Sequence, residues 1–169
     1  MYKFTYSFPL RILYRYGNIP LTILLSFFLV VSAANLDSSL YNLFPVAIIL
    51  LLIYFLNKQY LVLYKILPYK IEADNEKLIC SDFAFSKKKF IIFFSDISKL
   101  TGGIFEGSIK SLMKIYADKS NICIGFFPTI SNAKTLQTII LKRINQSLYD
   151  KVMAKAIPAK KVSSSGNKT

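Results

Sequence analysis

Pro20-Leu-Thr-Ile-Leu-Leu-Ser-Phe-Phe-Leu-Val-Val-Ser-Ala-Ala34 and Phe44-Pro-Val-Ala-Ile-Ile-Leu-Leu-Leu-Ile-Tyr-Phe-Leu56 are the two stretches that decide the fold of this chain. They lie within two uncharged segments of 21 residues (Tyr16–Leu36) and 20 residues (Ser38–Asn57), which meet at Asp37. A helix rises about 1.5 Å per residue, so each segment is long enough to cross a hydrocarbon layer of about 30 Å. The sequence therefore predicts a two-helix transmembrane hairpin within residues 16–67, ended by Pro68.

Basic residues flank this hairpin on both outer sides and are absent from its connecting loop. Lys3, Arg11 and Arg15 precede it, and Lys58, Lys65 and Lys70 follow it. Because Lys and Arg are enriched on the cytoplasmic side of membrane spans, we expect a multi-pass protein of the cytoplasmic (inner) membrane with both termini in the cytoplasm. Two alternatives remain open: a cleaved signal peptide ending near Val31-Ser-Ala33, and two buried helices of a soluble protein.

Two further segments flank the hairpin and its following domain. Residues 1–15 mix aromatic side chains with Arg11 and Arg15, a composition that suits the headgroup zone, so we expect a cytoplasmic, interfacial N-terminal segment. The basic tail at residues 157–169 has little apolar material to bury, and we expect it to be disordered.

Residues 68–156 have a different periodicity and predict a cytoplasmic domain. Short alternating runs separated by turn residues predict six or seven antiparallel strands over residues 69–127, with Lys89–Phe94 apolar enough for a central strand. From Ser131 onward, apolar residues recur every four positions and predict one amphipathic helix of roughly twenty residues. These positions are Leu136, Ile140, Ile144, Leu148 and Val152.

This arrangement resembles a pleckstrin-homology (PH) domain, and most closely the bacterial membrane-anchored PH-like family. The resemblance is carried by Tyr69-x-Ile71 with Leu78-Ile79, Phe85-Ser-Lys-Lys-Lys89, Ile92-x-x-x-Asp96-Ile97, Met113-x-Ile115 and the block Ile124–Leu136. It implies an antiparallel β-sandwich or barrel capped by a C-terminal helix, placed directly after the transmembrane helices. It also implies a scaffold or interaction module with no assigned chemistry.

The most suggestive polar feature is the run Lys87-Lys88-Lys89. Together with Arg11 and Arg15, these cations are candidates for contact with anionic lipid headgroups. The alternative is a solvated hairpin end that protects a strand edge from aggregation. Nucleic acid is not expected as a partner, because aromatic and basic residues are not interleaved in the basic C-terminal region.

The aromatic side chains Phe90, Phe93, Phe126 and Phe127 are candidates for a face that binds a partner membrane protein or a second copy. The alternative for Phe90–Phe94, which is apolar on both faces, is a strand buried between the core and a covering helix. Sequence alone leaves both open.

No pattern in the chain predicts a catalytic, cofactor-binding or metal-binding site, or a small-molecule substrate. There is no histidine, and Cys80 and Cys123 have no further soft ligands nearby in the sequence. The glycines at 102, 103 and 107 lack the Lys-Ser/Thr of a phosphate-binding loop. We therefore do not expect an enzyme.

These observations favour a non-catalytic membrane adaptor that presents its domain at the cytoplasmic face to a protein or a lipid surface. The alternative is a small accessory subunit or assembly factor that contacts a larger membrane complex through the hairpin. An oligomeric channel is a third, weaker class, because the two spans contain no charged residue.

Overall fold

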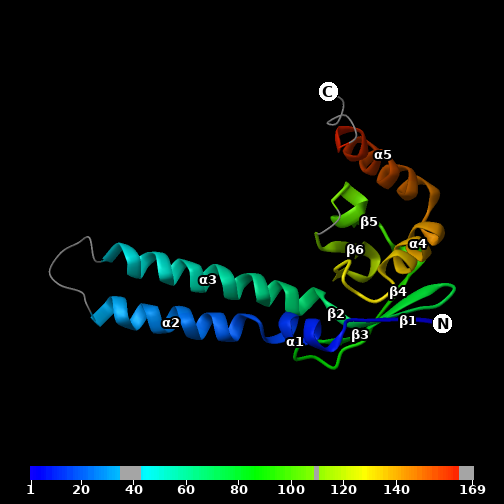
Figure 1. Ribbon diagram of the computed structural model, residues 1–169. Helices are drawn as coiled ribbons and strands as arrows, with labels where there is room; N and C mark the ends of the chain where they lie inside the picture. The colour runs from blue at the N-terminus through cyan, green and yellow to red at the C-terminus, as the bar shows by residue number, and fades with distance from the viewer. Residues whose placement is uncertain (35–42, 109–110, 164–169) are drawn as a thin grey trace. The chain divides into compact units, whose positions relative to one another are not determined.

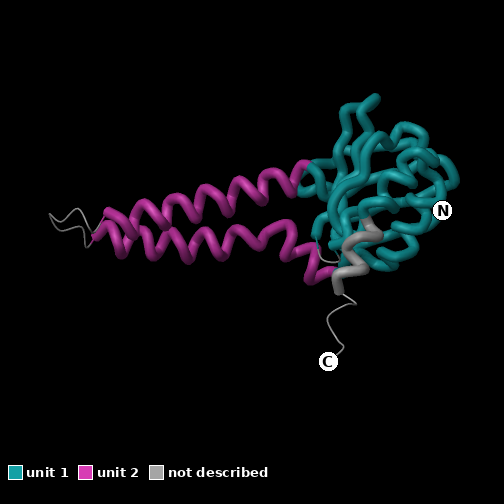
Figure 2. The backbone as a smooth tube through the Cα atoms, turned by 90° about the horizontal axis from the view of Figure 1, so that it is seen from above, with its two compact units in different colours: residues 1–7, 66–169 teal, residues 8–65 magenta. Residues whose placement is uncertain are grey.

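The structure is a computed structural model that describes residues 1–34, 43–108 and 111–163. It divides into two compact units, one formed by residues 8–65 and the other by residues 1–7 and 66–169 (Figures 1 and 2). The predicted order of apolar helices, antiparallel strands and C-terminal helical segment is confirmed, and the class is mixed α+β. The loop around Asp37 lies outside the described residues.

The helical unit consists of α1 (Phe8–Tyr16), α2 (Asn18–Ala34) and α3 (Leu43–Ile66). By length and hydropathy, α3 is a candidate membrane span of 24 residues. The pair α1 and α2 is a second candidate if it forms one span, with a bend of 42° at the break between them. The predicted first helix therefore begins earlier than Tyr16 and is interrupted at Gly17.

Half-buried residues on α2 and α3 repeat at alternating steps of three and four, the pattern of a coiled-coil seam. On α2 the seam positions are 18, 22, 25, 29 and 32, and on α3 they are 46, 49, 53, 56, 60 and 63. Most of the other side chains of both helices are exposed, and most of these are apolar, such as Phe27 and Leu51. The two helices therefore pack along one seam and expose apolar surface around it.

The second unit contains two antiparallel sheets. The first has the order β1-β2-β3-β4, formed by β1 (Tyr2–Thr5), β2 (Pro68–Ala73), β3 (Lys77–Phe83) and β4 (Phe90–Phe93). The second has the order β5-β6-β7, formed by β5 (Lys99–Thr101), β6 (Met113–Ala117) and β7 (Ile122–Phe126). Short 3-10 helices occupy Phe94–Asp96 (η2), Gly103–Glu106 (η3) and Asp118–Ser120 (η4).

β1 is an element that the sequence did not predict, because residues 1–15 were expected to be an interfacial segment. Instead, Tyr2–Thr5 pairs along its whole length with β2, with Phe4 opposite Ile71. All three helices of the helical unit are therefore inserted in the chain between two neighbouring, paired strands. The β domain consists of two pieces of sequence, one on each side of the helices (Figure 2).

The core of this domain lies between the sheets and the C-terminal helices. Fully buried members of the first sheet include Phe4, Ile71, Leu78 and Ile92, each 1% exposed or less. They are joined by members of the second sheet and of the helix that follows it, among them Met113, Ile115, Phe126, Leu136 and Ile140.

Two helices follow β7, where the sequence predicted one. α4 (Ala133–Arg143) ends at Ile144, which has extended backbone, and α5 (Gln146–Ser163) begins two residues later. α5 continues past Pro158 to Ser163, and the expectation of a disordered tail at residues 157–169 stays a prediction. Residues 164–169 lie outside the described chain.

Candidate functional site

The segments that connect the helices to the sheet are short, and each contains a buried residue. Tyr6 and Ser7 separate β1 from α1, and Leu67 alone separates α3 from β2. Tyr6 is 3% exposed, and Leu67 and Tyr69 are fully buried in the β domain. The rings of Tyr6 and Tyr69 also meet edge to face, with centroids 6.3 Å apart. Tyr6 and Leu67 are therefore part of the packed core of the domain.

β1 and its connection are also tied to the C-terminal half of the domain. The N–H of Phe127 donates to the Tyr6 hydroxyl at 2.8 Å. The N–H of Thr5 donates to Ser131 Oγ at 3.0 Å, and the Ser131 N–H donates back to the Thr5 carbonyl at 3.0 Å. These contacts join residues more than 120 positions apart in sequence. The N-terminal strand and its connection are therefore hydrogen-bonded to the segment that follows β7.

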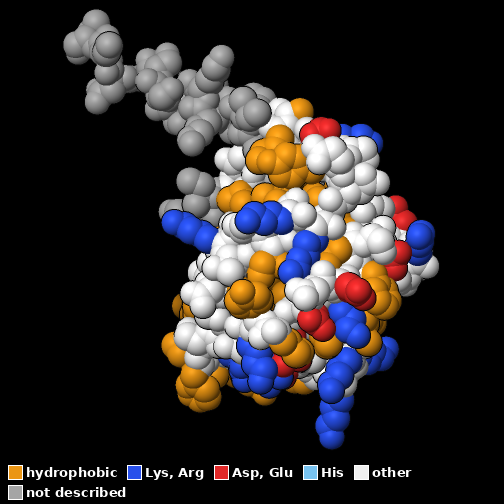
Figure 3. Space-filling view, turned by 90° about the vertical axis from the view of Figure 1, so that its right-hand side faces the viewer, with side chains coloured by type: hydrophobic (Ala, Val, Ile, Leu, Met, Phe, Trp, Pro, Cys, Tyr) orange, Lys and Arg blue, Asp and Glu red, His pale blue; other side chains and the backbone are white. Residues whose placement is uncertain are grey.

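The outer face of the first sheet carries basic and apolar side chains. Lys3, Glu72, Ile79 and Ile91 follow one another across the four strands in register. Lys70 binds Glu72 at 2.8 Å, and this hydrogen bond keeps the pKa of the Glu72 carboxyl below its usual value of 4.5. Figure 3 shows one face of the molecule, on which lysine and arginine side chains lie among hydrophobic ones.

The predicted lipid-contact residues Lys87, Lys88 and Lys89 lie in the loop between β3 and β4, and all three are exposed. Phe85, in the same loop, is 71% exposed and has a φ of 56°, a left-handed conformation that is rare for a bulky residue. The backbone N–H of Lys88 donates to Ser86 Oγ at 3.3 Å. This loop therefore presents three cations and one aromatic ring to solvent.

Arg11 and Arg15, the other predicted lipid contacts, belong to the helical unit. They lie four residues apart on α1, and so on one side of this helix. Phe8, Ile12, Leu13 and Tyr16 are exposed on the same helix, which is strongly amphipathic. A helix of this pattern suits a membrane interface, where apolar side chains and cations are both satisfied.

The four residues of the predicted partner face differ in exposure. Phe93 is 45% exposed, Phe90 and Phe127 are half-buried, and Phe126 is fully buried in the core. Phe126 therefore offers no surface to a partner. The predicted central strand Lys89–Phe94 is also wrong, because β4 is the outermost strand of its sheet, and its outward side chains Ile91 and Phe93 are exposed.

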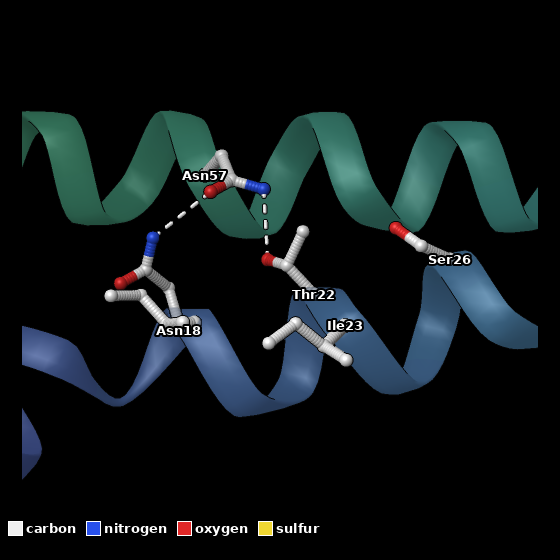
Figure 4. A pocket seen from close by; sticks show the side chains of 6 residues that line it. Asn18, Thr22, Ile23, Ser26 and Asn57 are labelled. Atoms are coloured by element: carbon white, nitrogen blue, oxygen red, sulfur yellow. Dashed lines mark hydrogen bonds between the residues drawn. The ribbon is translucent and has the colours of Figure 1, made fainter.

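A polar cluster joins the two long helices. Asn57 of α3 accepts a hydrogen bond from Asn18 at 2.9 Å and donates to Thr22 Oγ1 at 3.1 Å (Figure 4). The Tyr64 hydroxyl donates to Asn18 Oδ1 at 2.6 Å. Asn57 is the last residue of the second uncharged segment, and no pattern in the sequence predicted its role. Asn18, Thr22, Ser26 and Asn57 are among the residues that line a cleft of about 300 Å³.

A second cleft, of about 380 Å³, lies beside the end of β4. Its lining includes Asn75, Glu76, Phe93 and Arg143. Arg143 donates to Asn75 Oδ1 at 2.9 Å and lies over the ring of Phe94, 5.5 Å from its centroid. The guanidinium therefore fixes α4 against the turn between β2 and β3.

The described residues contain no group of three or more His, Cys, Asp or Glu side chains that could hold a metal ion. Cys80 is fully buried and Cys123 is half-buried, and neither forms a disulfide. Burial raises the pKa of both thiols, which favours the unreactive protonated form.

Comparisons of the chain with protein-family models, with curated proteins and with solved structures found no match.

Proposed function

We propose that this protein is a non-catalytic adaptor of the cytoplasmic membrane. Its helical unit spans the bilayer twice, both termini are cytoplasmic, and the β domain presents a binding surface at the inner face. The observation that carries the proposal is the insertion of all three helices between the paired strands β1 and β2.

This insertion constrains the topology independently of the charge distribution. β1 precedes the helices and β2 follows them, yet the two strands pair over four residues. Both ends of the helical segment must therefore lie on the same side of a membrane, which requires an even number of crossings. Two crossings, by the α1–α2 pair and by α3, satisfy this condition, whereas a single span or a cleaved first helix does not.

The charges then select the cytoplasmic side for the β domain. Lys3 precedes the first candidate span, and Arg11, Arg15, Lys58 and Lys65 lie in the parts of α1 and α3 that are nearest to the β domain in sequence. The apolar side chains exposed around the helical seam would be covered by lipid.

The short, buried connections support a presenting role for the domain. Tyr6 and Leu67 are packed in the core of the β domain, and the connections are only two residues and one residue long. Two antiparallel sheets followed by C-terminal helices support the resemblance to the PH-like family. Lys87–Lys89 on this domain are candidates for anionic lipid, and the exposed side chains of β4 are candidates for a protein.

The topology is tested by labelling single cysteines with a membrane-impermeant maleimide in intact cells. Both native cysteines are first replaced by serine. Ser38→Cys is expected to react from outside, whereas Lys87→Cys reacts only after the membrane is permeabilised. Labelling of Lys87→Cys in intact cells would overturn the proposal.

The adaptor role is tested by lysine crosslinking of the full-length protein in intact membranes, followed by mass spectrometry. A recurrent protein attached through Lys87, Lys88 or Lys89 is expected. A matched control replaces these three lysines with arginine, which keeps the charge and removes the reactive amines. A failure to recover any recurrent protein, including a second copy, would contradict the adaptor role.

A second candidate function is that of an accessory subunit of a larger membrane complex. It is favoured by the cleft on the helical unit, where Thr22, Ser26 and Asn57 offer polar groups beside an apolar surface. Such groups are typical of helix–helix contacts in membranes. Crosslinks confined to the helical unit, and retained when residues 69–169 are deleted, would favour this role over the adaptor.

A further inference from the structure

The loop between β3 and β4 lies at the end of the first sheet from which the chain continues into the helices. Pro68, the first residue of β2, pairs with Phe83, the last residue of β3, and only Leu67 separates Pro68 from α3. β1 runs toward the same end and is followed by α1 after two residues. Residues 84–89 therefore begin beside the point where the chain returns from the helical unit.

The length of α3 sets the level of this end of the sheet in the proposed topology. α3 has 24 residues and is about 36 Å long at 1.5 Å per residue. A bilayer with its headgroup regions is about 40–45 Å thick. A spanning α3 therefore ends at headgroup level, which suits Lys65 in its last turn. Because Leu67 alone joins α3 to the sheet, the loop that begins beside Pro68 is held near this level.

The loop projects one aromatic ring from a buried base. Phe83 is buried and meets the ring of Phe90 edge to face, with centroids 5.2 Å apart. The N–H of Ser86 donates to the Phe83 carbonyl at 3.4 Å, which closes a tight turn over Ala84 and Phe85. Phe85 is 71% exposed and has a φ of 56°, a conformation that costs free energy for a bulky side chain. The turn thus holds a large apolar ring outside the core of the domain.

Positive charge is in excess around this ring. Lys87–Lys89 are exposed, and no acidic residue occurs between Asp82 and Asp96. The strands β1 to β4 contain two acidic residues, Glu72 and Asp82. Asp82 is half-buried, and Glu72 is bound by Lys70 at 2.8 Å, with Lys89 also within its electrostatic reach. The exposed charge of the loop is therefore complementary to an anionic leaflet.

We propose that residues 85–89 form a second membrane contact, in which the Phe85 ring enters the interface of the inner leaflet and Lys87–Lys89 bind anionic headgroups. The inference deepens the proposed function, on which it rests for the spanning helices, by naming anionic lipid as the ligand of this loop. An aromatic ring beside a cluster of lysines suits the membrane interface. The opposite end of the sheet, where Phe93 pairs with Lys77, is then turned toward the cytoplasm.

Tryptophan fluorescence tests the depth of the loop in the full-length protein, because the chain contains no tryptophan of its own. Phe85→Trp is reconstituted in vesicles of one part phosphatidylglycerol to three parts phosphatidylcholine. Lipid brominated at the headgroup end of its acyl chains is expected to quench this fluorescence strongly, and acrylamide in the buffer only weakly. Phe93→Trp, which is also exposed but lies at the opposite end of the sheet, is the matched control and should show the reverse.

The role of the lysines is tested by removing the negative charge of the lipid or the positive charge of the loop. Lipid quenching of Phe85→Trp should fall in vesicles of phosphatidylcholine alone. It should also fall in the anionic vesicles when Lys87–Lys89 are replaced by glutamine, about fivefold in the ratio of docked to free loop for each lysine removed. Replacement by arginine keeps the charge and should keep the quenching. Equal quenching in both kinds of vesicle would overturn the electrostatic contact.

Leu51→Trp, in the apolar middle of α3, separates this inference from the proposed function. Quenching of Leu51→Trp by deeply brominated lipid, with none at Phe85→Trp, overturns the loop contact and leaves the spanning adaptor. No quenching at Leu51→Trp overturns the spanning helix and therefore the proposed function itself. Acrylamide quenching that is as strong at Phe85→Trp as at Phe93→Trp overturns the loop contact and identifies a solvated hairpin end.

Discussion

Replacing Tyr6 with phenylalanine is the most direct test of whether the N-terminal strand belongs to the β domain. The substitution keeps the aromatic ring, which is 3% exposed and packs against Tyr69. It removes the hydroxyl that accepts the Phe127 N–H at 2.8 Å. The perturbation therefore removes the hydrogen bond between Tyr6 and the Phe127 N–H, which joins the first and last parts of the domain.

The expected loss of stability follows from the burial of the Phe127 N–H, the donor that remains. A buried N–H left without an acceptor costs about 1–3 kcal/mol. Phe127 is half-buried, so the lower half of this range applies, about 1–2 kcal/mol. For a domain of about 100 residues, each kcal/mol corresponds to about 4–8 °C, so the expected fall in Tm is about 4–16 °C.

The assay is thermal unfolding of the full-length protein in detergent, followed by near-UV circular dichroism. Hydrogen exchange of the peptide that contains Phe127 reports on the amide itself. Tyr2→Phe is the matched control, because Tyr2 lies in the same strand but is 59% exposed. An unchanged Tm in Tyr6→Phe, with the Phe127 amide as protected as in the native chain, would refute the assignment of residues 1–7 to the domain.

Three further predictions concern the helical unit and the outer face of the sheet. Asn57→Leu should weaken the packing of α2 on α3 by about 1 kcal/mol, because two interhelical hydrogen bonds of about 0.6 kcal/mol each are lost; titration with a denaturing detergent measures this, and an unchanged midpoint would contradict it. Gly17→Ala should destabilise the helical unit in the same titration, since the added Cβ would lie 2.6 Å from the Tyr60 hydroxyl and 2.5 Å from a backbone carbonyl oxygen. Combining it with Tyr60→Phe should recover part of the loss, and no recovery would place the whole clash at the carbonyl. Lys70 lowers the pKa of Glu72 in the folded state, so the ionised Glu72 carboxylate stabilises the fold fully above pH 4.5. This stabilisation is lost as the pH falls through the lowered, folded-state pKa. Glu72→Gln should therefore lose less stability in acid than the native chain, and an identical dependence of stability on pH would contradict this.

Local patterns in the sequence predicted the elements that depend on near neighbours. The uncharged runs located both long helices, since hydropathy over some twenty residues is a local property. Asp74 and Asn75 marked the turn between β2 and β3, where the Asp74 N–H bonds the Lys77 carbonyl. The stripe that begins at Leu136 located the C-terminal helical segment, although not its break at Ile144.

The elements that the sequence missed depend on distant partners. Tyr2–Thr5 is only four residues long, and the strand that completes it begins at Pro68. The side chains of β4 are apolar on both faces, a pattern that two-sided burial would also produce, so the strand was expected at the centre of the sheet. The break between α4 and α5 has no proline or glycine to mark it, and the four-residue stripe continues across it. Of the candidate site residues, Phe126 was misplaced for a similar reason, because pattern alone does not distinguish an inward aromatic ring from an outward one.

The placement of the helices between β1 and β2 has a consequence for biosynthesis. Residues 1–7 leave the ribosome before the helices, and their partner strand follows only after both long helices have been made. In the proposed topology, the N-terminal strand stays unpaired in the cytoplasm until the hairpin has entered the bilayer and β2 has been made. A chain inserted with its ends on opposite sides could never close this sheet, and its exposed, unpaired strand would mark it for degradation. Folding of the domain is thus expected to act as a proofreading step for membrane insertion.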